Sequence, residues 1–241
     1  MKRMRIAVVV CVAAGVVGAW AGWLRLGLAR AQDAGMSYSK MAPLGEYLMA
    51  NRTDEIALAR SAAPPSISDH AEVLVLGVHG YQTAVRGTNG FVCIVARSWM
   101  EGPNDPGFWN PTVRAPNCFN APGARSRLPI AIMTTDLVLR GRSKAQIFDA
   151  IRAAVDKNKL PTLEPGAMCY MMSKQQYLNS GAGYAHPHLM FFVPLREAKV
   201  WGAGLPGSPI LEYDEAAERL SVLVVPVARW SDGTPDPASG K

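Results

Sequence analysis

Residues 81–97 read YQTAVRGTNGFVCIVAR, in which two runs of strand-forming residues flank a segment rich in glycine and asparagine. Valine, isoleucine, threonine and aromatic residues are enriched in β-strands. The Asn89-Gly90 pair tolerates the positive φ angles that tight hairpins require. The stretch therefore predicts an antiparallel β-hairpin that turns between Gly87 and Gly90.

Further apolar runs predict strands on either side of this hairpin. They are residues 72–78, 130–139, 167–173, 188–194 and 219–230. Residues 51–61 have helical spacing, and a second helix begins at Ser143, which forms a capping box with Gln146. Because the strands occur in runs and do not alternate with helices, we expect an α+β fold. Its mostly antiparallel β-sheet of about six strands would be packed by the two helices.

Residues 98–128 have no sustained hydrophobic period and predict a long proline-rich loop without regular structure. The prolines are Pro103, Pro106, Pro111, Pro116 and Pro122. Long loops inside compact domains are uncommon and are often functional. The aromatic residues of the loop either pin it to the core or form a ligand-stacking surface; they are Trp99, Phe108, Trp109 and Phe119.

Three cysteines follow the N-terminal segment, which itself contains Cys11. In an oxidising compartment, an odd set predicts one disulfide and one free thiol. We expect Cys93 to pair with Cys118, because this bond would clamp the proline-rich loop and contribute roughly 3 kcal/mol; the other two pairings stay open. Cys169 lies in the apolar run AMCYMMS, a setting that keeps a thiol protonated and inert.

The first 31 residues have the pattern of an export signal. The basic start MKRMR precedes an apolar run over residues 6–24, and ARA at residues 29–31 has the form of a cleavage site. The run is also long enough for a retained anchor in the inner membrane, so cleavage and anchoring both stay open. In either case we expect a periplasmic or secreted protein whose contact with the membrane is limited to this segment.

The remainder of the chain is expected to form one domain. The hydrophobic content of 49% and the charged content of 18% indicate a packed core and argue against disorder. We expect a linker over residues 32–50, a single globular domain over residues 51–230 and a flexible tail over residues 231–241.

The basic character of the chain is concentrated in the N-terminal segment. Residues 1–31 hold five of the 25 lysines and arginines and none of the 19 acidic residues, which leaves 20 basic and 19 acidic side chains elsewhere. Nucleic-acid binding depends on a concentrated positive field. The composition therefore argues against a nucleic-acid partner.

The most distinctive candidate site is the stretch YAHPHLMFFVP at residues 184–194. Side chains alternate across a strand, so His186, His188, Met190 and Phe192 are predicted to lie on one face. Two histidines spaced in this way can bind one metal ion if a third donor joins them. They can also act as acid or base, or simply form hydrogen bonds at a strand end.

The third metal ligand would come from elsewhere in the chain. His79 follows an expected strand, and Cys169 and nearby methionines are further donors; such a set suits copper or zinc. A hydrolase with a metal-bound water would instead bring a carboxylate to the histidines, with Asp69 or Asp136 expected in that role.

The polar connection before the histidines could line a pocket beside them. Its candidate ligand-binding residues are Ser173, Lys174, Tyr177 and Tyr184. A solvated loop is the alternative. The sequence has no Gly-x-Ser-x-Gly, His-Glu-x-x-His or Cys-x-x-Cys motif, so the common hydrolase and redox classes have no support.

The motifs GTNGFVC, MCYMMSKQQYL and HPHLMFF, together with ARSAAPPSIS, RSW and FWNP, resemble a family of exported bacterial hypothetical proteins. The resemblance spans about residues 54–232. It implies bacterial origin and export, and it brings no activity, cofactor or catalytic residue.

The sequence thus favours an exported, non-catalytic protein that binds a metal ion, a small molecule or an envelope component. A histidine- or metal-dependent hydrolase and a structural envelope protein are the alternatives. A structural protein would lack a pocket beside the histidines and would expose an apolar patch to a partner.

Overall fold

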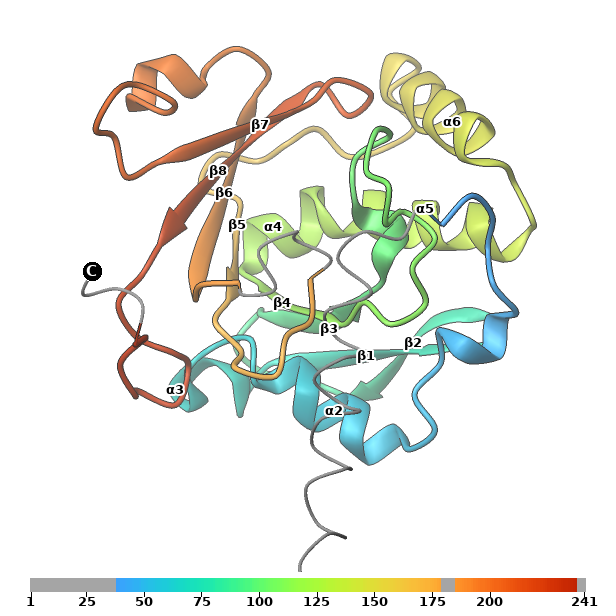
Figure 1. The fold of residues 1–241 in the computed structure, drawn as a ribbon, viewed down its shortest axis with the longest axis horizontal. Helices are drawn as coiled ribbons and strands as arrows, with labels where there is room; N and C mark the ends of the chain where they lie inside the picture. Colours follow the sequence, from blue (N-terminus) through green and yellow to red (C-terminus); the bar gives the residue numbers. More distant parts are fainter. Residues whose placement is uncertain (1–37, 179–184, 238–241) are drawn as a thin grey trace, which may run out of the picture.

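The computed structural model describes residues 38–178 and 185–237, which fold around one eight-stranded sheet (Figure 1). The strand order is β2-β1-β3-β4-β5-β6-β8-β7. The strands are β1 (Glu72–Gly77), β2 (Gly80–Val85), β3 (Val92–Ala96), β4 (Ala115–Phe119), β5 (Met168–Met171), β6 (His188–Pro194), β7 (Leu211–Glu215) and β8 (Leu220–Pro226). Neighbouring strands are antiparallel except β1 and β3, which are parallel. The α+β class and the mostly antiparallel sheet are confirmed, with eight strands instead of about six.

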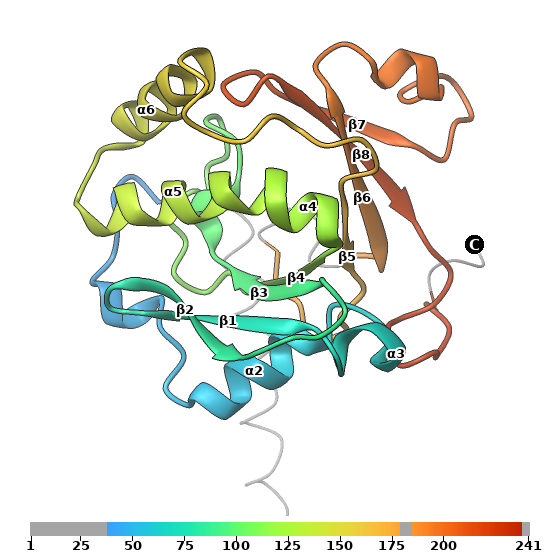
Figure 2. The ribbon, with the colours of Figure 1, turned by 180° about the vertical axis from the view of Figure 1, so that it is seen from behind.

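Helices cover both faces of the first half of the sheet. The α-helices are α2 (Arg52–Arg60), α3 (Pro65–Ser68), α4 (Ala121–Ser126), α5 (Leu128–Leu139) and α6 (Lys144–Asp156), and the 3-10 helices are η1 (Leu44–Glu46), η2 (Ser98–Met100) and η3 (Ala198–Trp201). Helix α2 packs on β1 and β3, whereas α4 and α5 lie on the other face (Figures 1 and 2). Both predicted helices are confirmed as α2 and α6, and α6 begins at the predicted capping box.

The predicted hairpin over residues 81–97 is wrong. Its two strands form as β2 and β3, but β1 lies between them and pairs with both. The hairpin is formed by β1 and β2, which meet at the pair Gly77 and Gly80. Three residues of β1 are buried and none is exposed, whereas β2 has one buried and two exposed residues, so the more apolar strand lies between β2 and β3. Gly87 packs directly against the start of β1. A Cβ atom at position 87 would lie 2.1 Å from the backbone nitrogen of Glu72, so only glycine fits there.

The predicted strand over residues 130–139 is also wrong, because this segment is helix α5. Pro129 lies in the first helical turn, where the absence of its N–H has no cost. Thr134 and Thr135 donate their hydroxyl protons to the carbonyls of Ile130 and Ala131, four residues earlier. The segment is apolar on nearly all sides, so its hydrophobic pattern cannot distinguish a buried strand from a buried helix.

The predicted loop over residues 98–128 is irregular only in its first half. Its second half contains β4 and α4, and β4 is a central strand. Pro116 is tolerated within β4 because β5 pairs only with Cys118 and Phe119, beyond the proline.

The predicted disulfide between Cys93 and Cys118 is formed. The two cysteines lie directly opposite one another on β3 and β4, and both are buried. The bond therefore joins two neighbouring strands at the base of α2 and does not clamp a structureless loop. Cys169 is the free thiol of the described residues.

The sheet curls strongly along its length. Strands β1, β2 and β3 run across the view in Figures 1 and 2, whereas β6 and β8 run steeply to them. The concave side faces α4 and α5, and the main core there includes Ile94, Ala131 and Phe192. This curvature brings the β7–β8 hairpin, at one end of the sheet, near the segment that follows β3.

A fully buried ion pair connects α2 to the sheet. Arg97 donates to Glu55 at 2.9 Å, and both side chains are almost completely excluded from solvent. Arg97 also donates to the carbonyls of Tyr47 and Val95, and Glu55 accepts the backbone N–H of Leu76. All three guanidinium nitrogens of Arg97 and the Oε1 atom of Glu55 are thus hydrogen bonded, which offsets the cost of burying the two charges.

The segments that flank the expected domain are partly described. In the expected linker, Tyr47 is buried and its hydroxyl donates to the Trp109 carbonyl at 2.8 Å. In the expected tail, the N–H of Asp236 donates to the carbonyl of Ala228. Residues 1–37, including Cys11, lie outside the described residues. Within residues 38–178 and 185–237, no helix is long and apolar enough to cross a membrane.

Reducing the disulfide is expected to lower the free energy of unfolding by about 3 kcal/mol, because the bond closes a loop with a sequence separation of 25 residues. Urea unfolding with and without a reductant measures this change. The double substitution Cys93→Ala/Cys118→Ala serves as control, since its midpoint should not respond to reductant. An unchanged wild-type midpoint, with three thiols titrated in residues 38–241 after reduction, would contradict the prediction.

Substituting Glu55→Gln is expected to lower the free energy of unfolding by about 3–5 kcal/mol, because it leaves the Arg97 charge buried without a counter-charge. Urea unfolding monitored by circular dichroism measures the loss. Asp54→Asn, on the exposed side of the same helix, is the matched control and should cost less than about 0.5 kcal/mol. Equal effects of the two substitutions would show that the ion pair does not stabilise the fold.

Candidate functional site

The concave side of the sheet contains a cavity of about 1070 Å³. Its walls come from β3 to β8, from α5 and α6, and from residues 96–106. The small side chains of Ala96, Ala115 and Ala131 leave this volume open, and Met190 and Val224 contribute apolar surface. Drug-sized ligands typically occupy cavities of about 300–1,000 Å³ with apolar walls and a few polar groups. The cavity is thus large enough for a small organic molecule.

His188 lines this cavity from the first position of β6. Met190 and Phe192 line it from the same strand, whereas Phe191 and Val193 pack in a separate cluster on the other face. The predicted alternation is therefore confirmed within β6. The Nδ1 atom of His188 lies 2.7 Å from the backbone oxygen of His186, and desolvation lowers the pKa of the His188 ring, which disfavours its charged form.

His186 precedes β6 and has a different environment. Its Nδ1 atom lies 2.6 Å from an Oδ atom of Asp236, which is fully buried, while the His186 side chain is 46% exposed. His186 is not among the residues that line the cavity with His188. The predicted alternation does not apply to the His186 side chain, because β6 begins only at His188.

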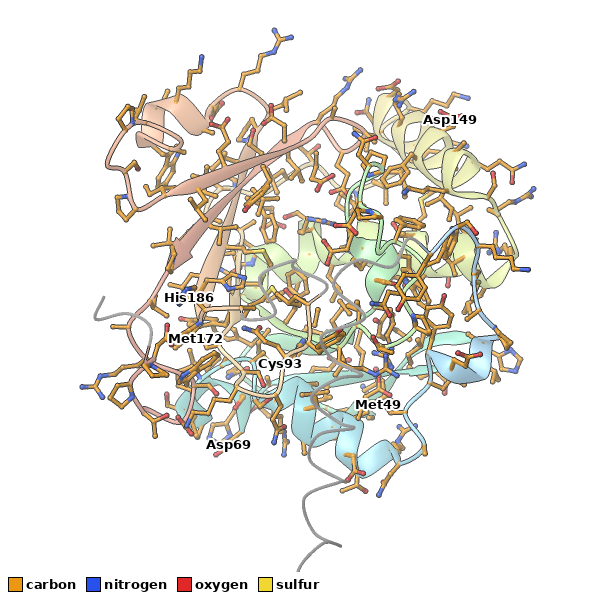
Figure 3. All side chains as sticks on the ribbon, viewed as in Figure 1. Met49, Asp69, Cys93, Asp149, Met172 and His186 are labelled. Carbon is orange, nitrogen blue, oxygen red and sulfur yellow. A yellow bond between two sulfur atoms is a disulfide. The ribbon has the colours of Figure 1, made fainter. Side chains whose placement is uncertain are left out.

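The other predicted metal ligands and acids lie elsewhere. His79 occupies the β1–β2 turn, Asp136 lies on α5 near Gly80, and Asp69 follows α3. Figure 3 places His186 next to the start of β6 and Asp69 close to α3. Among the described residues, no group of three histidine, cysteine, aspartate or glutamate side chains could hold a metal ion.

The polar residues predicted around the histidines are dispersed. The buried Ser173 hydroxyl lies 2.6 Å from the Ser61 hydroxyl, and Lys174 forms an exposed ion pair with Asp232 at 2.7 Å. The backbone of Tyr177 bridges to Arg114. None of Ser173, Lys174 and Tyr177 lines the cavity that contains His188. Tyr184 lies outside the described residues.

Cys169 is buried beneath the cavity floor in β5, and its thiol lies 3.3 Å from Oδ1 of Asn117. Burial raises the pKa of the thiol, so the nucleophilic thiolate is disfavoured. This environment agrees with the inert role expected from its apolar run.

The aromatic side chains of the segment 98–128 lie in two different places, the core around Tyr47 and the cavity wall. Trp99, Phe108 and Trp109 are buried together in the cluster around Tyr47, and the Trp99 Nε1 donates to the Thr135 hydroxyl. These three pin the irregular segment to the core. Phe119 lies in the cavity wall, where it stacks against Phe192.

Two carboxyl groups of the cavity, those of Glu101 and Glu215, have strongly raised pKa values. Desolvation, together with the negative charges of Asp105 and Glu215, raises the pKa of Glu101 to about 7. Desolvation and the neighbouring Glu218 likewise raise the pKa of Glu215 to about 7, although Arg127 opposes this shift. Near neutral pH, each group is therefore divided between a neutral O–H donor and a charged acceptor.

Arg127 is a buried cation of the cavity wall. One terminal nitrogen pairs with Glu218 at 3.2 Å, and the guanidinium lies 5.4 Å from the centre of the Phe192 ring. Its Nε and Nη1 atoms are buried and have no hydrogen-bond partner. A buried donor without an acceptor is uncommon in folded proteins.

Sequence reasoning did not select Glu101, Glu215 or Arg127. Each lies in a polar segment, and no motif or spacing distinguishes it from an ordinary surface charge. The three residues are separated along the chain and meet only because the sheet curls.

No protein-family model, curated protein or solved structure matches this chain. The resemblance to exported hypothetical proteins therefore stays a prediction. The cavity has to be interpreted from its own geometry and charge.

The free energy of unfolding is expected to fall as the pH rises from about 5 to about 8. Glu101 and Glu215 have folded-state pKa values raised to about 7, so these two groups bind more protons in the folded protein than in the unfolded chain over this range. The double substitution Glu101→Gln/Glu215→Gln should reduce this pH dependence by on the order of 2 kcal/mol. Urea unfolding at both pH values measures the effect.

Glu212→Gln provides the control, because it also removes one carboxyl group from the wall of the same cavity. It should leave the pH dependence unchanged. A double substitution that retains the wild-type pH dependence would show that the two carboxyl groups do not titrate differently in the folded protein.

Proposed function

We propose that this protein is an exported, non-catalytic binding protein whose ligand is a small, largely apolar molecule. The observation that carries the proposal is the cavity of about 1070 Å³ on the concave face of the sheet. Apolar side chains form more than half of its wall, and polar and charged side chains, among them Asn117, His188, Arg127, Glu101 and Glu215, form the rest. This combination is typical of small-molecule sites.

Export is supported by two independent features. The basic and then apolar N-terminal segment has the pattern of an export signal. The disulfide between Cys93 and Cys118 is the kind of bond that persists in oxidising compartments and is rare in the cytosol. We propose a periplasmic or secreted location on these grounds.

The metal-binding version of the proposal receives no support from the arrangement of the histidines. His186 and His188 have different partners, and His79 lies in a turn of the β1–β2 hairpin. A small organic ligand therefore fits the described residues better than copper or zinc.

A histidine-dependent hydrolase is the second candidate. It is favoured by one observation: the Asp236 carboxylate lies 2.6 Å from the His186 ring and could orient it as a base. This carboxylate replaces Asp69 and Asp136, which were expected in that role. Because His186 does not line the cavity that could hold a substrate, binding without catalysis is the better-supported function.

A structural envelope protein is the remaining alternative. It would use the exposed apolar side chains Val200, Trp201, Leu205, Leu211 and Tyr213, near the β7 edge of the sheet. The cavity beside His188 argues against a purely structural role, since a structural protein needs no such volume.

The neutral apolar fluorophore N-phenyl-1-naphthylamine is expected to bind in the cavity with increased fluorescence. Val224→Trp should weaken its binding by about tenfold or more, because Val224 lines the cavity and the larger ring would occupy the volume. Fluorescence titration of the full-length protein measures both affinities.

Val225→Trp is the matched control, because neighbouring residues of β8 project to opposite faces of the sheet. It should change the affinity by less than about twofold. Equal effects of the two substitutions, or no fluorescence increase with the wild-type protein, would overturn the proposed function.

A further inference from the structure

The guanidinium of Arg127 is held in place but is incompletely hydrogen bonded. It lies at the junction of α4 and α5, with 7% of its surface exposed, and it lines the cavity. It forms an ion pair with Glu218 and lies over the face of the Phe192 ring. Both Nε and Nη1 lack an acceptor. Leaving buried donors unpaired costs about 1–3 kcal/mol each, so an acceptor at this point would bind favourably.

We propose that the cavity binds an apolar monocarboxylate whose carboxylate accepts hydrogen bonds from Arg127 while its hydrocarbon chain lies against the apolar wall. This inference rests on the proposed function and adds the chemical class of the ligand. Arginine is well suited to the role, because its planar guanidinium presents several donors to a carboxylate.

The apolar wall next to Arg127 matches the second part of such a ligand. Phe192 lies directly beneath the guanidinium, and Met190, Val222 and Val224 extend the wall along β6 and β8. These two strands pair over their full lengths, so their cavity-facing side chains form one continuous surface. A hydrocarbon chain that leaves the guanidinium would displace water from this surface.

The charge balance favours a single negative charge over a multiply charged anion. Glu218 already compensates Arg127, and five carboxyl groups line the cavity: Glu101, Asp105, Glu212, Asp214 and Glu215. A phosphate dianion would add two charges beside these carboxyl groups. A monocarboxylate brings one charge and two acceptor oxygens, so it satisfies the donors at a smaller electrostatic cost.

The carboxyl groups of the cavity also predict the pH dependence of binding. Asp105 and Glu215 face Glu101, and Glu218, Arg127 and Asp214 face Glu215. When protonated, Glu101 and Glu215 become O–H donors to a carboxylate; when ionised, they repel it. Raised pKa values of about 7 place this change near neutrality. Binding should therefore tighten as the pH falls from about 8 to about 6.

Other titratable groups of the cavity do not reverse this direction. They are Arg97, Arg152, His188 and Glu212. Arg97 is engaged by Glu55, and protonation of His188 at lower pH would add a positive charge that also favours an anion.

Three probes with the same chain length test the headgroup: decanoate, 1-decanol and decylammonium. We expect isothermal titration calorimetry of the full-length protein at about pH 6 to give a dissociation constant about tenfold or more lower for decanoate than for 1-decanol. This advantage should shrink at about pH 8. Equal affinities of the acid and the alcohol, or tighter binding of decylammonium, would overturn the proposal.

The double substitution Arg127→Met/Glu218→Gln removes both members of the buried ion pair, so it leaves no charge unpaired. It should reduce the preference for decanoate over 1-decanol to within about twofold. Glu218→Gln alone is the control, because it retains the Arg127 donors and should keep or increase the preference. If the double variant keeps the full preference, the carboxylate does not bind to Arg127, and the proposal is wrong.

Carboxyl-labelled ¹³C decanoate gives a readout on the wild-type protein that does not depend on the variants. The pKa of bound decanoate should lie below that of the free acid, because Arg127 stabilises the carboxylate. An unshifted or raised pKa would contradict the inference. The two proposals fail separately: if Val224→Trp displaces the neutral fluorophore while decanoate shows no preference, only the carboxylate assignment is lost.

Discussion

The buried ion pair between Arg97 and Glu55 is the constraint on which the arrangement of the N-terminal half depends. Two charges removed from water are tolerated only when hydrogen bonds and an opposite charge replace the solvent. Arg97 meets this requirement with the carboxylate of Glu55 and the carbonyls of Tyr47 and Val95. Helix α2, the segment before it and the end of β3 must therefore come together in one geometry. Glu101 comes four residues after Arg97 in the chain, so the buried ion pair also restricts where Glu101 can lie.

The curvature of the sheet converts this scaffold into a site. One end of the sheet is held between α2 and the α4–α5 pair, while β6, β8 and β7 curl around the concave side (Figures 1 and 2). Side chains from β3 to β8 then face a common volume that small alanine side chains leave open. Within it, low solvent access both raises the pKa values of Glu101 and Glu215 and strengthens any interaction with Arg127. Geometry and electrostatics of the cavity thus have the same origin.

The sequence predictions were correct where the structure depends on interactions between residues close together in the chain, and they failed where it depends on residues far apart. Helix α6 was predictable because its capping box and its apolar stripe are local. The position of β3 was not predictable. Strand β3 could pair with β2 or with β1, and the Asn-Gly turn does not decide between these two partners. Residues 130–139 were assigned to the wrong element because an all-round apolar segment has no diagnostic period. The alternation that placed His188 on the cavity face succeeded inside β6 and failed for His186, which precedes the strand.

The amino-acid sequence by itself determined the α+β class, helices α2 and α6, most of the strands and the expectation of one disulfide, because these depend on side-chain periodicity, capping and cysteine number. Only the tertiary structure decided the strand order, the cavity and the meeting of Arg127 with Glu101 and Glu215. Those features arise from contacts between residues far apart in the chain. A charged side chain in a polar segment has the same local signature whether it faces solvent or a buried cavity, so its environment is set by packing alone.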